Sequence, residues 1–130
     1  MKPRFTLKEV FKIIDSGDIN QTWFSAPSRS YRVVIRIYER SQSPKNPDQA
    51  MAFILAGIKE LTDLHFVKTV FQWGKPADVY GLIYDGKPWY IKFTIEDDGA
   101  LQEISFHPPE LEMTTIGGIK IPVGELSYEK

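Results

Sequence analysis

The chain has 130 residues, 42% hydrophobic and 25% charged, which is typical of a soluble globular protein with one core. Its 16 Lys and Arg balance 17 Asp and Glu, so it lacks the overall basic excess that non-specific nucleic-acid binding usually requires. The absence of cysteine excludes disulfides and thiolate metal sites, and two histidines argue against a histidine-based metal site. We expect one cytoplasmic domain over residues 1–130, with no membrane segment, metal or cofactor.

Residues 1–62 are predicted to be mainly helical. Residues 5–17, FTLKEVFKIIDSG, carry the signals of a short helix. Thr6 can cap the N-terminus, and Glu9 three residues later completes a capping box. Gly17 stands where a left-handed residue commonly ends a helix.

The stretch at residues 30–41, SYRVVIRIYERS, allows two interpretations. Its density of β-branched residues favours a strand. Basic residues at spacings of three and four favour a helix with one basic face, which we prefer. These residues are Arg29, Arg32, Arg36 and Arg40. They are candidates for binding RNA phosphates, although such a row is more often a solvated helix face.

A buried helix is predicted next, at residues 47–62, where Pro47 suits the first turn and an apolar stripe faces a core. From residue 66 onward the hydrophobic period changes from 3.6 to 2, which indicates strands. Four are expected, at residues 66–73, 78–84, 88–95 and 101–107. Helices followed by an antiparallel meander favour an α+β domain, with residues 66–107 as the sheet and 108–130 as an extended tail containing at most a short strand.

Hairpin register predicts which side chains share a face of this sheet. We take Asp85-Gly86 and Asp98-Gly99 as two-residue turns. One face then holds the pairs Tyr90–His107, Lys92–Ser105 and Thr94–Glu103, and the other holds Ile91–Phe106, Phe93–Ile104 and Ile95–Gln102. Gly81 falls beside Tyr90, where the missing side chain would leave open space next to the ring.

The polar row Tyr90, Lys92, Ser105 and His107 suits metal-free cleavage of RNA. In that reaction the 2′-hydroxyl is the nucleophile, and the protein supplies a base, an acid and positive charge around the phosphate. Histidine can be the acid or the base, lysine stabilises the phosphate, and tyrosine can donate a proton or stack on a base. With no carboxylate predicted beside the histidine, a serine-hydrolase triad is not indicated. A polar row is also what the exposed face of any antiparallel sheet would show.

A resemblance to a known family bears on whether this polar row is a catalytic site or an ordinary sheet surface. Residues 55–108 contain, in order, Leu61, Phe66 and Lys68; Asp78, Val79 and Tyr80; Tyr90, Ile91 and Lys92; and Ser105, Phe106 and His107. This series resembles the toxin of the motility quorum-sensing regulator family. That family belongs to type II toxin–antitoxin systems and cleaves mRNA on a RelE-like fold.

The resemblance implies catalytic roles for Lys68 and Tyr90, which match positions that the family uses in cleavage. His107 falls where many members have a lysine, and a histidine there retains a group that can transfer protons. With Lys92, these residues form the expected catalytic set, and Tyr80 is a candidate RNA contact. The chain departs from the family at Ala77, where members often have glutamine.

Two classes of function follow. The first is a ribonuclease toxin with a cognate antitoxin and an mRNA substrate, which we prefer. The second is a non-catalytic acidic binding protein, such as an immunity or antitoxin-like partner. The acidic character of the chain after residue 47 favours the second class, because acidic surfaces steer onto basic nucleases.

Overall fold

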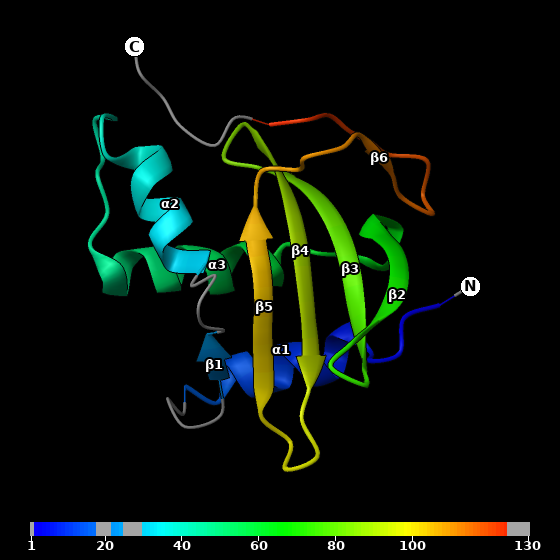
Figure 1. Ribbon diagram of the computed structural model, residues 1–130. Coiled ribbons are helices and arrows are strands. Elements are labelled where there is room, and N and C mark those ends of the chain that lie inside the picture. The colour runs from blue at the N-terminus through cyan, green and yellow to red at the C-terminus, as the bar shows by residue number, and fades with distance from the viewer. Residues whose placement is uncertain (1, 18–21, 25–29, 125–130) are drawn as a thin grey trace.

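The computed structural model describes residues 2–17, 22–24 and 30–124. Its helices are α1 (Leu7–Asp15), α2 (Ser30–Tyr38), α3 (Pro47–Lys59) and the 3-10 helix η2 (Asp63–His65). Its strands are β1 (Thr22–Phe24), β2 (Phe66–Gln72), β3 (Lys75–Tyr84), β4 (Lys87–Ile95), β5 (Leu101–His107), β6 (Met113–Thr114) and β7 (Lys120–Ile121). The fold is α+β, with a mainly antiparallel sheet in the order β1-β5-β4-β3-β2 and a separate β6–β7 pair (Figure 1). In this described part, no helix combines the length and apolar character that crossing a membrane requires.

The predicted helix ends are confirmed by the capping contacts. The Glu9 backbone N–H donates to Thr6 Oγ1 at 3.1 Å, and the Thr6 backbone N–H donates to Glu9 Oε1 at 3.0 Å, forming the expected capping box of α1. Gly17 follows α1 with φ +67°, as a left-handed terminator should. In α3 Pro47 lies in the first turn, and residues 30–38 are the preferred helix, α2.

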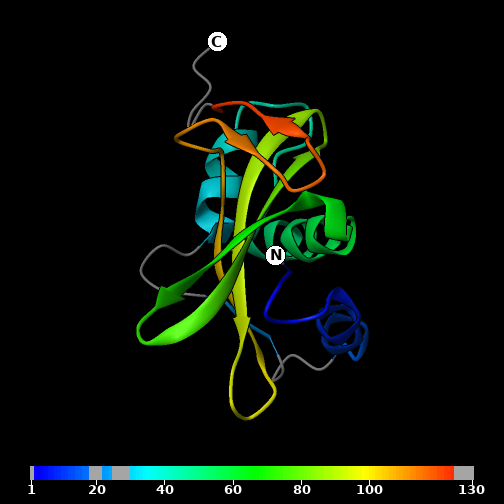
Figure 2. The ribbon, with the colours of Figure 1, turned by 90° about the vertical axis from the view of Figure 1, so that its right-hand side faces the viewer.

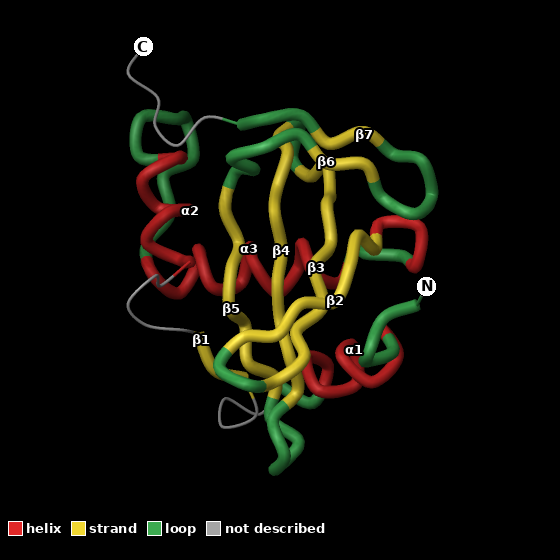
Figure 3. The backbone as a smooth tube through the Cα atoms, turned by 45° about the vertical axis from the view of Figure 1, so that its right-hand side comes forward, coloured by secondary structure: helices red, strands yellow, loops and turns green. Residues whose placement is uncertain are grey.

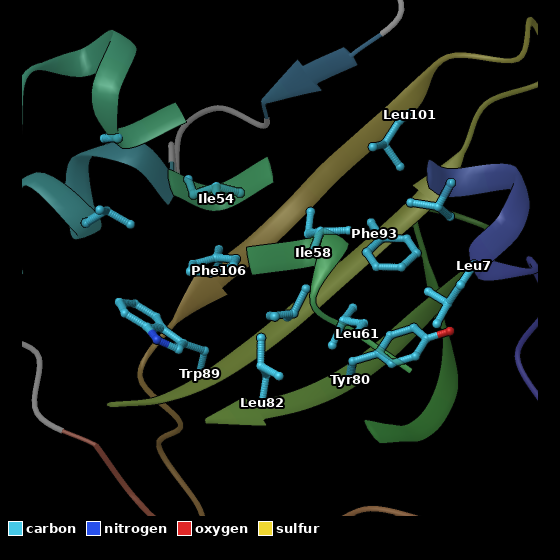
Figure 4. Packing of buried hydrophobic residues seen from close by; sticks show 14 of the residues in the cluster. Leu7, Ile54, Ile58, Leu61, Tyr80, Leu82, Trp89, Phe93, Leu101 and Phe106 are labelled. Atoms are coloured by element: carbon cyan, nitrogen blue, oxygen red, sulfur yellow. The ribbon is translucent and has the colours of Figure 1, made fainter. Parts of the chain in front are cut away.

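Helices α1 and α3 cover one face of the sheet (Figures 1 and 2). The core lies between these helices and the sheet. In the close view of Figure 4, Trp89, Phe93 and Phe106 of the sheet surround Ile54 and Ile58 of α3. All five side chains are fully buried. In the tube of Figure 3, β6 and β7 cross one end of the sheet, near the ends of β3 and β4.

The predicted order of helices first and strands afterwards is only partly right. Strand β1 lies between α1 and α2 in the sequence and pairs in parallel with β5, from Thr22 opposite Leu101 to Phe24 opposite Glu103. Three residues are too few to show an alternating pattern, so β1 was not visible in the sequence. Strands β2 to β5 form the expected antiparallel meander.

The loop between β4 and β5 has three residues instead of the predicted two. The Glu96 backbone N–H donates to the Ala100 carbonyl at 2.8 Å, and the Gly99 N–H donates to the Glu96 carbonyl at 2.8 Å. Asp97 and Asp98 therefore occupy the centre of the turn, and Gly99 follows with φ +89°. A turn closed by a left-handed glycine is the usual three-residue hairpin loop, and it shifts the strand register by one.

A bulge in β5 then restores the predicted register. Beside the loop, the pairs are Ile95–Leu101, Thr94–Gln102 and Phe93–Glu103, each one residue from the prediction. Beyond the irregularity, Lys92–Ser105, Ile91–Phe106 and Tyr90–His107 pair as predicted, which leaves Ile104 as the extra residue. The shift turns Glu103 into the core, where it is 0% exposed and accepts a hydrogen bond from Ser30 Oγ at 2.9 Å.

Candidate active site

The face of the sheet opposite α1 and α3 carries a cleft of about 380 Å³. Its lining comes from the start of β2, from β4 and β5, and from the segment after β5. These residues are Val67, Lys68, Tyr90, Lys92, Ser105, His107, Glu110, Leu111, Glu112 and Met113. The cleft therefore brings together all four residues predicted to be catalytic: Lys68, Tyr90, Lys92 and His107.

Strand register explains why these side chains meet. Tyr90 lies opposite His107, and Lys92 lies opposite Ser105. On its other side Lys92 pairs with Val79, which in turn pairs with Lys68. Directly paired residues project on the same face of a sheet. One row therefore runs from Lys68 on β2, across β3 and β4, to Ser105 on β5.

Tyr90 and His107 form one stacked unit. Their ring centroids are 5.1 Å apart, and the planes differ by 12°. His107 Nδ1 lies 2.8 Å from the Pro108 carbonyl oxygen. Because a carbonyl only accepts hydrogen bonds, Nδ1 carries a proton, and Nε2 is the nitrogen that gains or loses one.

Lys68 and Lys92 place two positive charges in the cleft. Partial burial is the main cause that lowers the pKa of Lys92, and the neighbouring Lys68 ammonium lowers it further. An anionic ligand between these two ammonium groups would offset both effects. Burial also raises the pKa of Tyr90, with a contribution from Glu110, so its phenol stays protonated at neutral pH.

The predicted open space beside Tyr90 is wrong, because the chain after β5 fills it. A Cβ atom built on Gly81 would lie 2.8 Å from Ile121 Cγ1 and 3.1 Å from Met113 Cε. The tail expected at residues 108–130 thus includes a short hairpin, β6–β7, that packs against the sheet. We call residues 108–124 the C-terminal segment.

Backbone hydrogen bonds hold the C-terminal segment beside the cleft. The Ile116 N–H donates to the Phe66 carbonyl at 2.8 Å, and the Gly117 N–H donates to the Leu64 carbonyl at 3.1 Å. The segment contributes two carboxylates to the cleft, Glu110 and Glu112, which the sequence did not indicate. The available signal was weak: two prolines after β5 predict a rigid exit from the sheet, but not its direction.

The predicted RNA-binding residues do not join this site. Tyr80 is 0% exposed and stacks on Phe93 in the core, which is incompatible with the predicted RNA contact. Arg32, Arg36 and Arg40 are exposed on or just after α2 and do not line the cleft. Arg29 lies outside the described residues.

Asp78, one of the residues that carry the resemblance, has a structural role. Its two carboxylate oxygens accept hydrogen bonds from the backbone N–H groups of Arg4 and Phe5, each at 2.9 Å, and from Thr69 Oγ1 at 2.6 Å. The side chain is fully buried. Asp78 therefore attaches the chain before α1 to strand β3.

None of the models of known protein families matches this chain, and a search of curated proteins finds no match. The residues that line the cleft are therefore the basis for assigning its chemistry. A stacked imidazole and phenol, two ammonium groups and two carboxylates provide proton transfer and anion binding in one place.

Proposed function

We propose that the protein is a metal-independent endoribonuclease that cleaves mRNA by attack of the 2′-hydroxyl on the adjacent phosphate. The observation that carries the proposal is the convergence of Lys68, Tyr90, Lys92 and His107 in one cleft. For Tyr90 and His107, the resemblance and the predicted strand register pointed to the same residues by separate routes. The reaction needs the groups that the cleft offers: cations for the phosphate, and side chains that transfer protons.

The proposal extends to the biological class. A RelE-like toxin of a type II toxin–antitoxin system, inhibited by a cognate antitoxin, is the function that the resemblance in residues 55–108 implies. A cleft with an exposed Lys68 and a half-buried Lys92 suits such a pair, because a tight-binding protein can block it directly.

The direct test is cleavage of RNA by the purified full-length protein in the presence of a chelator. The expected products carry 2′,3′-cyclic phosphate and 5′-hydroxyl ends. We expect His107→Ala and Lys92→Met each to lower the cleavage rate by about 10²–10⁴-fold, as removal of a proton-transfer or charge-stabilising group does. Lys12→Met, which removes an exposed lysine of α1 outside the cleft, is the matched control and should retain the wild-type rate.

Intact RNA after prolonged incubation with the folded wild-type protein would contradict the proposal. Equal rates for Lys92→Met and Lys12→Met would contradict the location of the site. With intact RNA, the alternative of a non-catalytic acidic binding protein becomes the better explanation.

A further inference from the structure

The inference concerns Glu110, deepens the proposed ribonuclease function and rests on it. The backbone around Glu110 is fixed on both sides. Pro108 and Pro109 are buried, and the Pro109 carbonyl accepts a hydrogen bond from the Gly124 N–H at 3.0 Å. Further along the chain, the side chain of Met113 lies against Gly81. Glu110, which is exposed, therefore lies at a fixed place in the wall of the cleft.

Cleavage by a 2′-hydroxyl requires two proton transfers, and the cleft has one imidazole. The 5′-oxygen leaves as a strongly basic alkoxide, so it needs the strongest acid available. An imidazolium is a much stronger acid than a phenol, and burial weakens the Tyr90 phenol further by raising its pKa. His107 is therefore the best acid, with its imidazolium supported by the Nδ1 hydrogen bond to the Pro108 carbonyl.

The base must then be another group in the cleft. Tyr90 is held as a neutral phenol, and Lys68 and Lys92 are needed as cations. Carboxylates remain, and the lining contains Glu110 and Glu112. Of the two, Glu110 influences the electrostatics of the Tyr90–His107 unit, because its charge contributes to the raised pKa of Tyr90.

We infer that Glu110 is a catalytic residue, the general base that takes the proton from the 2′-hydroxyl, with His107 as the general acid. The 2′-oxygen forms a bond to phosphorus while its proton passes to the Glu110 carboxylate. The bond between phosphorus and the 5′-oxygen breaks, and His107 Nε2 gives its proton to that oxygen. The products are a 2′,3′-cyclic phosphate and a 5′-hydroxyl, and no other reactant is consumed.

This assignment fixes the pH dependence. The charged and titratable groups that line the cleft with Glu110 and His107 are Lys68, Tyr90, Lys92 and Glu112. The active form has Glu110 ionised and His107 protonated, so the rate falls at low pH as the base is protonated. It also falls at high pH as the acid loses its proton. If His107 were the base and Tyr90 the acid, the rate would instead rise as the imidazole becomes neutral.

The first experiment measures single-turnover cleavage against pH for the wild type and for Glu110→Gln. The probe is a short single-stranded oligoribonucleotide that contains a mapped cleavage site. We expect Glu110→Gln to lower the rate by about 10²–10⁴-fold and to lose the low-pH decline. Glu112→Gln should have the smaller effect and keep the bell shape. Equal losses in the two variants, or a wild-type rate in Glu110→Gln, would overturn the inference.

The second experiment separates acid from base. In an oligoribonucleotide whose leaving 5′-oxygen is replaced by sulfur, the thiolate leaves without a proton. We expect this substrate to restore cleavage by His107→Ala and to give no rescue of Glu110→Gln. Rescue of Glu110→Gln in place of His107→Ala would reverse the two roles and overturn the inference. Failure of the wild type to cleave any RNA would instead overturn the proposed function itself.

Discussion

At the scale of single residues, neighbouring groups determine the orientation and the charge interactions of side chains in the cleft. The Pro108 carbonyl fixes the tautomer of His107, and the ring of Tyr90 fixes the plane of its imidazole. Lys68 and Lys92 repel one another until an anion lies between them. These contacts exist before any ligand binds, which is the preorganisation that the proposed electrostatic catalysis needs.

A second residue-scale feature is Glu103, which lies buried in the core. Burial raises its pKa to about 8 from the usual 4.5 of a glutamate, and the hydrogen bond from Ser30 offsets this only in part. Its Oε1 has no hydrogen-bond partner among the described residues. At neutral pH this carboxyl is therefore mostly protonated in the folded protein and ionised in the unfolded chain.

This difference predicts a pH-dependent stability. Because the folded state binds the proton more tightly, the contribution of Glu103 is fully favourable below pH 4.5 and is lost as pH rises towards 8. The loss is of the order of a few kcal/mol. We expect Glu103→Gln, which keeps the size and a hydrogen-bond acceptor for Ser30, to raise Tm at about pH 8 and to change it little at about pH 5.

Thermal unfolding followed by circular dichroism at the two pH values measures this effect. Glu39→Gln, at an exposed position after α2, is the control and should follow the wild type. Parallel pH dependence of Tm in the wild type and Glu103→Gln would show that Glu103 is ionised in the folded state.

At the scale of elements, the site depends on two features of the chain around β5. The bulge after Glu103 returns the strand to the register that places His107 opposite Tyr90. The C-terminal segment then leaves β5 and packs over Gly81, which closes one wall of the cleft. Both features lie outside the regular pattern of alternating side chains.

The contact at Gly81 predicts the effect of a single methyl group. In Gly81→Ala the new Cβ would lie 2.8 Å from Ile121 Cγ1, so the β6–β7 hairpin must move. We expect a loss of stability of about 1–3 kcal/mol from overpacking. Displacement of Glu110 should also lower the cleavage rate by up to about 100-fold, measured well below the melting temperature.

Gly57→Ala is the matched control, because its Cβ would overpack the opposite face, 2.9 Å from Phe106 Cζ. It should lower Tm without a comparable loss of cleavage. If Gly57→Ala and Gly81→Ala impair cleavage equally, the C-terminal segment has no specific role in the site.

Regular elements could be predicted from the sequence because their signals are local. The capping box at Thr6 and the alternating residues of β4 each depend on side chains a few positions apart. The register at Tyr90 and His107 was predicted correctly only because two errors cancelled, the three-residue loop and the bulge at Ile104. The C-terminal segment could not be predicted, since its position depends on contacts with Gly81 and Phe66, far away in the sequence.

At the scale of the whole molecule, the hydrophobic core and the proposed catalytic cleft lie on opposite faces of one sheet. Helices α1 and α3 bury the apolar face (Figure 2). The cleft lies on the other face. Along the chain, residues 1–47 carry the basic excess and the remainder is acidic. Because the cleft and the core lie on opposite faces of the sheet, a ligand can reach the cleft without disturbing the core.

The central claim, that this cleft cleaves RNA, is tested most directly in growing bacteria. The measurement is RNA 5′-end mapping after controlled expression of the wild type, Lys92→Met and His107→Ala, with folding of each variant verified by circular dichroism. We predict that the wild type stops growth and creates new RNA ends, and that both variants are harmless. Unchanged RNA and normal growth with folded wild-type protein would contradict the claim.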